Sequence, residues 1–217
     1  MKALFALIFS ISLQTCISNT TPFNNSEAIW TPPEMNQEGL KKAYFASGCF
    51  WCVEAIYESV KGVKEVHSGY AGGFTKNPNY NQIGTGRTGH AESVEVIYNP
   101  NQVSYNTLLR VFFGSHDPTT PNRQGPDYGS QYRSIAFYTN EFERESIINY
   151  IKTLNDGNYF SKKIITEIKP LEKFYYAEDY HQDYEKNNPD NPYVKNVSIP
   201  RLKKFQKQYP ELLKEIH

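Results

Sequence analysis

Cysteine is scarce in this chain of 217 residues, which has three cysteines, at positions 16, 49 and 52. A structural zinc site takes about four Cys or His ligands, and no second cysteine pair accompanies Cys49 and Cys52. The histidines that would have to complete such a site are scattered along the sequence: His67, His90, His116 and His181. The sequence therefore does not predict a metal site.

An excess of either charge is also missing, because 23 basic and 23 acidic residues cancel and no run of like charges forms a block. Nucleic-acid binding leaves a basic patch or arm, so the composition does not indicate a nucleic-acid partner. Internal repeats and low-complexity tracts are absent from the domain as well. With 39% hydrophobic and 15% aromatic residues the chain is able to bury one substantial core, and we expect one domain with tails.

The apolar run at the N-terminus, residues 3–13 after Lys2, is too short to span a membrane and has the charge and length of a secretory signal. Residues 13–16 (LQTC) resemble a bacterial lipobox, which predicts cleavage before Cys16 and lipidation of that cysteine. Thr15 is a weaker residue there than Gly, Ala or Ser, so ordinary cleavage is the alternative. A buried N-terminal helix is disfavoured because no polar face accompanies the apolar run.

We therefore expect a signal peptide over residues 1–15, a flexible tether over 16–39 and a folded domain over 40–217. The tether is rich in Ser, Thr, Asn and Pro, which suits a linker. The protein is expected to be exported to the bacterial cell envelope or periplasm as a lipoprotein, with a lipid anchor on Cys16 as its membrane contact.

The most informative feature present is the tetrad Cys49-Phe50-Trp51-Cys52. It follows the short apolar run 43–48 and precedes residues 53–60, which have helical spacing, so Cys49 is predicted at a helix N-terminus. That position favours an anion and predicts a lowered thiol pKa. Residues three apart on a helix have Cα atoms roughly 5 Å apart, within the range of a disulfide. The pair is therefore expected to cycle between dithiol and disulfide.

Apolar periodicity predicts alternating strands and helices over about 130 residues. Strands are expected within 43–46 and over 63–70, 93–98, 132–138 and 164–168, and helices over 53–60, 104–114, 141–154 and 201–208. Such an order favours an α+β fold, a two-layer sandwich of a mixed or antiparallel sheet with packed helices and a long irregular C-terminal segment.

Two motifs have competing interpretations. Gly84 to Gly89 fits Gly-x-Gly-x-x-Gly, but it follows a loop, leads into a strand and has Leu109 where an acid is required, so a dinucleotide site is rejected. The Cys-x-x-Cys pair fits a general thiol-disulfide oxidoreductase. In thioredoxins, however, tryptophan precedes the first cysteine, whereas here two aromatic residues lie between the cysteines and suit a binding wall. A sulfoxide-binding or adhesion module without thiol chemistry is a further alternative.

Glu92 stands at the edge of an aromatic, glycine-rich region. A single glutamate is ordinarily a solvated surface residue. Several polar residues outside the predicted helices accompany it, where sites tend to be built: Tyr80, Asp127, Tyr132 and His181.

The sequence contains the following motifs in order: Gly48-Cys49-Phe50-Trp51, Ser68-Gly69-Tyr70-Ala71-Gly72-Gly73, Gly89-His90-Ala91-Glu92, Gln131-Tyr132-Arg133-Ser134 and Tyr180-His181-Gln182. Their order and approximate spacing resemble the peptide methionine sulfoxide reductase A family from about residue 42 to residue 193. The resemblance implies reduction of the S epimer of methionine sulfoxide, free or in proteins, to methionine.

The resemblance also implies a role for each residue. Cys49 attacks the sulfoxide sulfur, and Glu92, as a neutral acid, protonates the oxygen. The remaining roles implied are hydrogen bonding of that oxygen by Tyr80 and Tyr132 and binding of the S-methyl group by Phe50 and Trp51. We place Asp127 and His181 in a supporting polar network, and a purely structural role for them is the alternative.

Many relatives have a resolving cysteine near the C-terminus, whereas this chain has no cysteine after Cys52. Cys52 is therefore the resolving candidate, and the Cys49 sulfenic acid is expected to condense with it. We expect no bound cofactor, a thioredoxin-like dithiol as electron donor, and a monomer.

Overall fold

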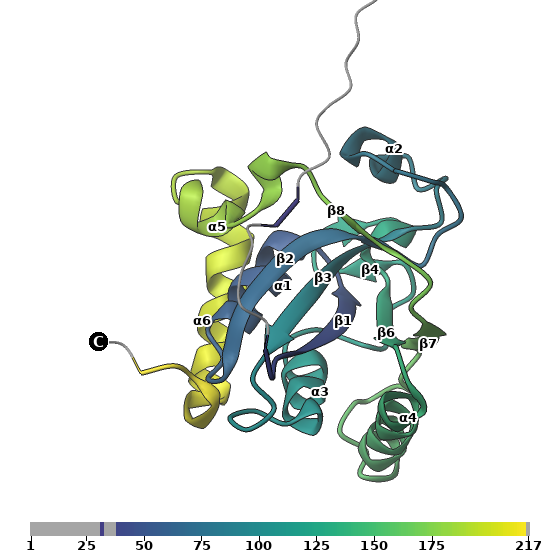
Figure 1. The fold of residues 1–217 in the computed structure, drawn as a ribbon, viewed down its shortest axis with the longest axis vertical. Helices are drawn as coiled ribbons and strands as arrows, with labels where there is room; N and C mark the ends of the chain where they lie inside the picture. The colour runs from purple at the N-terminus through teal and green to yellow at the C-terminus, as the bar shows by residue number, and fades with distance from the viewer. Residues whose placement is uncertain (1–30, 33–37, 216–217) are drawn as a thin grey trace, which may run out of the picture.

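A six-stranded mixed sheet forms the centre of the fold in the computed structural model, which describes residues 31–32 and 38–215 (Figure 1). The strand order is β7-β6-β1-β3-β2-β8, with β6 and β7 parallel and the other neighbours antiparallel. These strands are β1 (Lys41–Ser47), β2 (Val63–Ala71), β3 (Ala91–Tyr98), β6 (Ser134–Tyr138), β7 (Glu167–Pro170) and β8 (Phe174–Tyr176). A separate two-stranded ribbon consists of β4 (Arg123–Gln124) and β5 (Asp127–Tyr128).

The helices are α1 (Phe50–Glu58), α2 (Tyr80–Gly84), α3 (Tyr105–Gly114), α4 (Glu141–Asp156), α5 (Tyr184–Asn187) and α6 (Ile199–Gln208). Short 3₁₀ turns cover Ser130–Tyr132, Asp179–His181 and Pro210–Leu212, and a π-helical turn covers Val194–Ser198. Asn79, Ser104 and Asn140 cap α2, α3 and α4, because each side chain accepts a hydrogen bond from a backbone N–H of the first turn.

Helices α1, α3 and α4 pack on the sheet, and α6, drawn in yellow in Figure 1, packs against α1. Phe45 of β1 lies at the centre of this layer, with its ring 5.3 Å from that of Tyr57 and 5.2 Å from that of Phe112. The opposite face of the sheet has a smaller apolar cluster around Tyr44, Ile135 and Phe137. Apolar residues on both faces explain why the central strands are almost completely buried.

The predicted α+β fold with a mixed sheet and packed helices is confirmed. Helix α2 was missed, because its five residues lie in a polar, glycine-rich stretch without apolar periodicity. The last predicted strand, expected from residue 164, begins later, at Glu167. The C-terminal segment is not wholly irregular, since it contains β8, α5, the π-helical turn and α6.

The predicted signal peptide and Cys16 lie outside the described residues. Over residues 31–32 and 38–215, no helix has the length and apolar character needed to cross a membrane.

Candidate active site

Cys49 occupies the junction between the end of β1 and the start of α1, as predicted. It is the N-cap residue of α1 and is 6% exposed. Gly48 makes this junction possible, because its φ of +95° is left-handed and a β-carbon there would lie 2.7 Å from the side chain of Gln124. The strand thus turns sharply into the helix and places the sulfur at the positive end of the helix dipole.

Glu92 lies on β3, opposite Tyr70 of β2, and is only 3% exposed. Its Oε2 accepts a hydrogen bond from the backbone N–H of Phe50 at 3.0 Å, which places the carboxyl group at the first turn of α1. The Glu92 pKa is raised to about 8, chiefly by burial, with smaller contributions from the charges of Asp127 and Cys52, while the Phe50 hydrogen bond opposes the shift. Glu92 is therefore a protonated acid at neutral pH.

The two thiols are free and buried, and each influences the pKa of the other. Burial raises the pKa of Cys49, and the neighbouring Cys52 and Glu92 raise it further. The direction of the Cys49 pKa in the site without substrate is therefore opposite to the lowering predicted from the helix N-terminus, and burial is the largest cause. The pKa of Cys52 is lowered instead, first by the hydrogen bond from the Cys49 thiol and, despite burial, by the positive charge of Arg201.

The phenol groups of Tyr80 and Tyr132 both lie near Glu92 and Cys49. Tyr80 is the first residue of α2, and Tyr132 ends the 3₁₀ turn that precedes β6. Burial raises the pKa of each phenol, and the charges of Glu92 and Cys49 raise it further. Both hydroxyl groups therefore stay protonated and are able to donate hydrogen bonds near Cys49.

The aromatic residues between the cysteines have different environments. Phe50 is 1% exposed, and its ring lies 6.3 Å from the Tyr80 ring in a stacked arrangement. Trp51 is partly exposed and stacks on Tyr184, with ring centroids 3.7 Å apart. Its indole Nε1–H donates to Nδ1 of His181 at 3.0 Å. Trp51 is thus held rigidly beside the reactive thiol, as a binding wall requires.

His181 is 1% exposed and accepts the Trp51 hydrogen bond through Nδ1, so its ring hydrogen is on Nε2. That nitrogen lies 3.9 Å from Oε2 of Glu178. Burial lowers the pKa of His181 to about 4, which keeps the ring neutral at physiological pH. His181 therefore orients Trp51 as a neutral hydrogen-bond acceptor, and it is not a protonated acid at physiological pH.

Asp127 reaches the site through Tyr193, a residue not selected from the sequence. The Tyr193 hydroxyl donates to Oδ2 of Asp127 at 2.7 Å and lies 3.9 Å from Sγ of Cys52. Sequence analysis missed Tyr193 because it lies where aromatic and charged residues mix without a period. It also missed Glu178, whose carboxylate accepts from the Tyr70 hydroxyl at 2.8 Å and the Tyr80 N–H at 2.9 Å.

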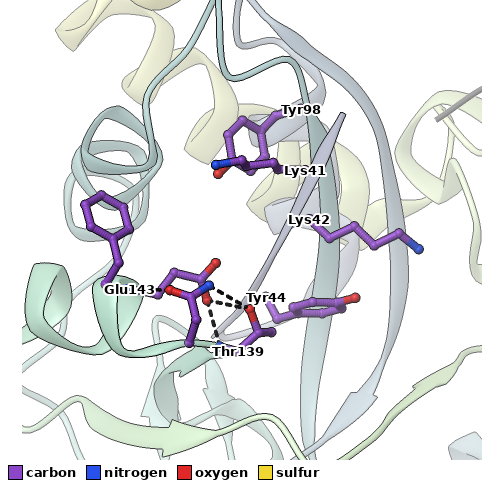
Figure 2. A pocket seen from close by; sticks show the side chains of 8 residues that line it. Lys41, Lys42, Tyr44, Tyr98, Thr139 and Glu143 are labelled. Carbon is purple, nitrogen blue, oxygen red and sulfur yellow. Dashed lines mark hydrogen bonds between the residues drawn. The ribbon is translucent and has the colours of Figure 1, made fainter. Parts of the chain in front are cut away.

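The described residues contain no candidate metal site, and a cavity at the other end of β1 is separate from Cys49. In the part of the chain that the structure describes, no group of three or more His, Cys, Asp or Glu side chains is placed to bind a metal ion. A cavity of about 450 Å³ lies beside the start of β1, whereas Cys49 follows its end (Figure 2). Its buried Glu143 accepts from the backbone N–H and the hydroxyl of Thr139 at 2.7 and 2.9 Å, which is a structural role at the start of α4.

The family model described as peptide methionine sulfoxide reductase matches residues 41–213. A similar relative is peptide methionine sulfoxide reductase MsrA 2 of Synechocystis, 47% identical over 184 residues that cover 84% of this chain and 86% of the relative. The enzyme MsrA of Nautilia profundicola is 49% identical over 168 residues, which cover 77% of this chain and 95% of the relative.

Solved structures agree with these relatives. Methionine sulfoxide reductase A of Corynebacterium diphtheriae superposes with a TM-score of 0.65 at 38% identity, covering 72% of this chain and 78% of that one. The reduced form of Mxr1 from Saccharomyces cerevisiae superposes with a TM-score of 0.67 at 33% identity, covering 73% and 91%. The buried thiol pair, the protonated Glu92 and these comparisons lead to one conclusion: the chain belongs to the peptide methionine sulfoxide reductase family.

Proposed function

We propose that this protein reduces the S epimer of methionine sulfoxide, free or in proteins, to methionine. The observation that carries the proposal is the buried carboxyl group of Glu92, which is protonated at neutral pH and hydrogen-bonded to the residue that follows Cys49. Sulfoxide oxygen leaves readily only when it is protonated, and a neutral carboxylic acid in an apolar site supplies that proton.

In the first step the Cys49 thiol releases its proton to solvent and its sulfur attacks the sulfoxide sulfur, while Glu92 transfers its own proton to the oxygen. Tyr80 and Tyr132 donate hydrogen bonds to the same oxygen as negative charge develops on it. Phe50 and Trp51 hold the S-methyl group. The oxygen ends on Cys49, so that one thiol and one sulfoxide become one sulfenic acid and one thioether, and Glu92 regains a proton from solvent.

In the second step Cys52 attacks the sulfur of the Cys49 sulfenic acid, a disulfide forms and water leaves. The positions of the two cysteines support this assignment, because both are buried, with Cys49 as the N-cap of α1 and Cys52 in its first turn. A thioredoxin-like dithiol then reduces the disulfide and is itself oxidised. No bound cofactor takes part, and a monomer suffices because the residues assigned to the chemistry come from one chain.

The test is single-turnover reduction of a peptide that contains either epimer of methionine sulfoxide, followed by mass spectrometry. Without reductant, the S epimer should give about one methionine per protein, together with a protein that has lost two hydrogens. With dithiothreitol, turnover should continue. The R epimer should remain unchanged, and equal reduction of both epimers would contradict the proposed specificity.

A general thiol-disulfide oxidoreductase would need the cysteine pair but not an acid beside it. The Glu92→Gln variant separates the two functions, because it should retain any activity on a small disulfide substrate while losing sulfoxide reduction. The burial of Glu92 next to Cys49 supports sulfoxide reduction as the principal activity.

We further propose that residues 1–15 are a signal peptide, that Cys16 carries lipid, and that residues 16–39 tether a domain over 40–217 at the bacterial cell envelope. The lipobox-like sequence supports this placement, as does the start of the family match at residue 41. Mass spectrometry of the mature protein from its native host tests it, since an uncleaved N-terminus would contradict it.

A further inference from the structure

Cys52 is surrounded by one continuous part of the chain that precedes and begins α6. It is 1% exposed and faces Tyr193, Ser198 and Arg201. The other titratable neighbours are Cys49 at the start of α1 and Glu92 on β3. A buried thiol that must become a thiolate needs a compensating positive charge or hydrogen-bond donors among such neighbours.

Each of the two hydroxyl groups also donates to a carboxylate: Tyr193 to Asp127 at 2.7 Å, and Ser198 to Glu185. A hydroxyl group has one hydrogen, and the hydrogen bonds of Ser198 and Tyr193 to Cys52 lower the pKa of this thiol less than the charge of Arg201 does. Glu92 is an acid that would repel a thiolate if it were ionised. This leaves Arg201 as the positively charged neighbour.

Arg201 is held in a fixed position on α6. Its Nε donates to the carbonyl oxygen of Ser115 and its Nη2 to that of Ser47, both at 2.9 Å. The third nitrogen, Nη1, is next to the cysteine junction, since a β-carbon built on Gly48 would lie 3.4 Å from it. The two carbonyl partners are neutral, and the Asp127 carboxyl group is a titratable neighbour that the Arg201 charge also influences. A guanidinium group remains charged at every relevant pH.

We propose that Arg201 is a positioning residue for the second step: its fixed guanidinium group stabilises Cys52 as the thiolate that attacks the Cys49 sulfenic acid. The same charge stabilises Cys52 as the leaving thiolate when the donor dithiol attacks the disulfide at Cys49. The lowered pKa of Cys52, to which Arg201 contributes, agrees with this role. The inference rests on the proposed function for its place in the reaction.

The experiment measures the Cys52 thiolate directly, by its ultraviolet absorbance as a function of pH. A Cys16→Ser, Cys49→Ser protein leaves Cys52 as the sole thiol and keeps a hydroxyl donor at position 49. Arg201→Met should raise the apparent pKa of Cys52 by about one to two units. Arg201→Gln should do the same while retaining amide donors for the two carbonyl groups, so it reports on charge even if Arg201→Met does not fold.

Lys204→Met is the matched control, because Lys204 lies one turn further along α6 and is exposed. It should leave the Cys52 pKa unchanged. In proteins with all cysteines, the Cys49 sulfenic acid formed in the first turnover should persist longer in Arg201→Gln at pH 7 than in wild type, and raising the pH should shorten its lifetime.

An unchanged Cys52 pKa in folded Arg201→Gln, or an equal shift in Lys204→Met, would overturn the inference. Failure of the wild-type protein to reduce methionine sulfoxide would instead overturn the proposed function. The thiolate titration needs no substrate, so the two failures are distinguishable.

Discussion

The carboxyl group of Glu92 accepts a hydrogen bond from the backbone N–H of Phe50 at 3.0 Å, directly beside the N-cap residue Cys49. One short contact thus joins strand β3 to the first turn of α1 and brings the acid to the nucleophile. Because burial keeps Glu92 protonated up to about pH 8, the acid and the thiol occupy the same site without two negative charges facing each other.

The first prediction concerns proton donation. Glu92→Gln should lower the single-turnover rate of sulfoxide reduction by about 10²–10⁴-fold, the usual contribution of general acid catalysis. In the wild type this contribution should be lost as the pH rises through about 8, where Glu92 ionises. Rapid-quench measurements of the single-turnover rate of the wild type and of Glu92→Gln between about pH 5 and 9 test both statements.

Alkylation of Cys49 by iodoacetamide is the control for this variant, and it should change comparatively little. Lower pH should partly restore sulfoxide reduction in Glu92→Gln, since solvent supplies the missing proton. A variant with wild-type single-turnover rates would remove Glu92 from the mechanism.

The second prediction concerns the resolving thiol. Cys52→Ser should complete one turnover and then stall with a thioredoxin-like donor, with Cys49 accumulating as sulfenic acid. Trapping with dimedone followed by mass spectrometry measures that species. Continued rapid turnover of Cys52→Ser with the same donor would show that the disulfide with Cys52 is dispensable.

Local features of this site were predictable from the sequence, whereas its electrostatics were not. The position of Cys49 at a helix start follows from an apolar run, a glycine and a helical stretch, all adjacent in the chain. The direction of its pKa shift depends on burial by distant segments and on Glu92, and the local dipole argument gave the wrong sign.

The residues that the C-terminal segment contributes to the site were also not predictable from the sequence. Tyr193 and Arg201 lie more than a hundred residues after Cys52. The apolar period over 201–208 predicts the helix that contains Arg201 but not its packing against α1, and Tyr193 lies before that helix in a stretch without a period. Among the helices, α2 was missed because its capping box, Asn79 with Gln82, is built from polar residues that also suit a loop.

The third prediction concerns the phenols. Tyr80→Phe and Tyr132→Phe should each lower the single-turnover rate by about 10-fold or more, and the double variant should approach the 10²–10³-fold loss typical of a missing oxyanion donor. Burial keeps both hydroxyl groups protonated, so the losses should not depend on pH between about 5 and 8. Equal rates in the double variant and the wild type would exclude both residues from oxygen stabilisation.

The fourth prediction concerns the binding wall. Trp51→Phe removes the indole N–H that donates a hydrogen bond to His181, and it reduces stacking on Tyr184. The KM for a methionine sulfoxide peptide should rise while single-turnover chemistry at saturation changes less, because the wall binds substrate and transition state alike. His181→Asn should have a smaller effect of the same kind. A loss confined to kcat would contradict the assignment of Trp51 to binding.

The last prediction concerns stability: Glu92→Gln should make the folded protein more stable, although it lowers the rate of sulfoxide reduction. Folding raises the Glu92 pKa from 4.5 to about 8, so between these values the folded protein binds a proton that the unfolded chain releases. Stability therefore falls as the pH rises through this window. Glutamine needs no proton and its carbonyl oxygen is able to accept the Phe50 hydrogen bond. Glu92→Gln should thus stabilise the fold by about 3 kcal/mol at pH 7 and by little near pH 4.

Glu95→Gln on the same strand is the contrasting control. Although burial raises the Glu95 pKa, hydrogen bonds from His67, Lys42 and Tyr176 lower it below its usual value, so the charged form is favoured by folding. Its replacement should destabilise the protein at pH 7. Urea unfolding of both variants at pH 4 and 7 measures the difference. A Glu92→Gln protein less stable than wild type at pH 7 would mean that Glu92 is ionised in the folded state, and general acid catalysis by Glu92 would then have no proton to transfer.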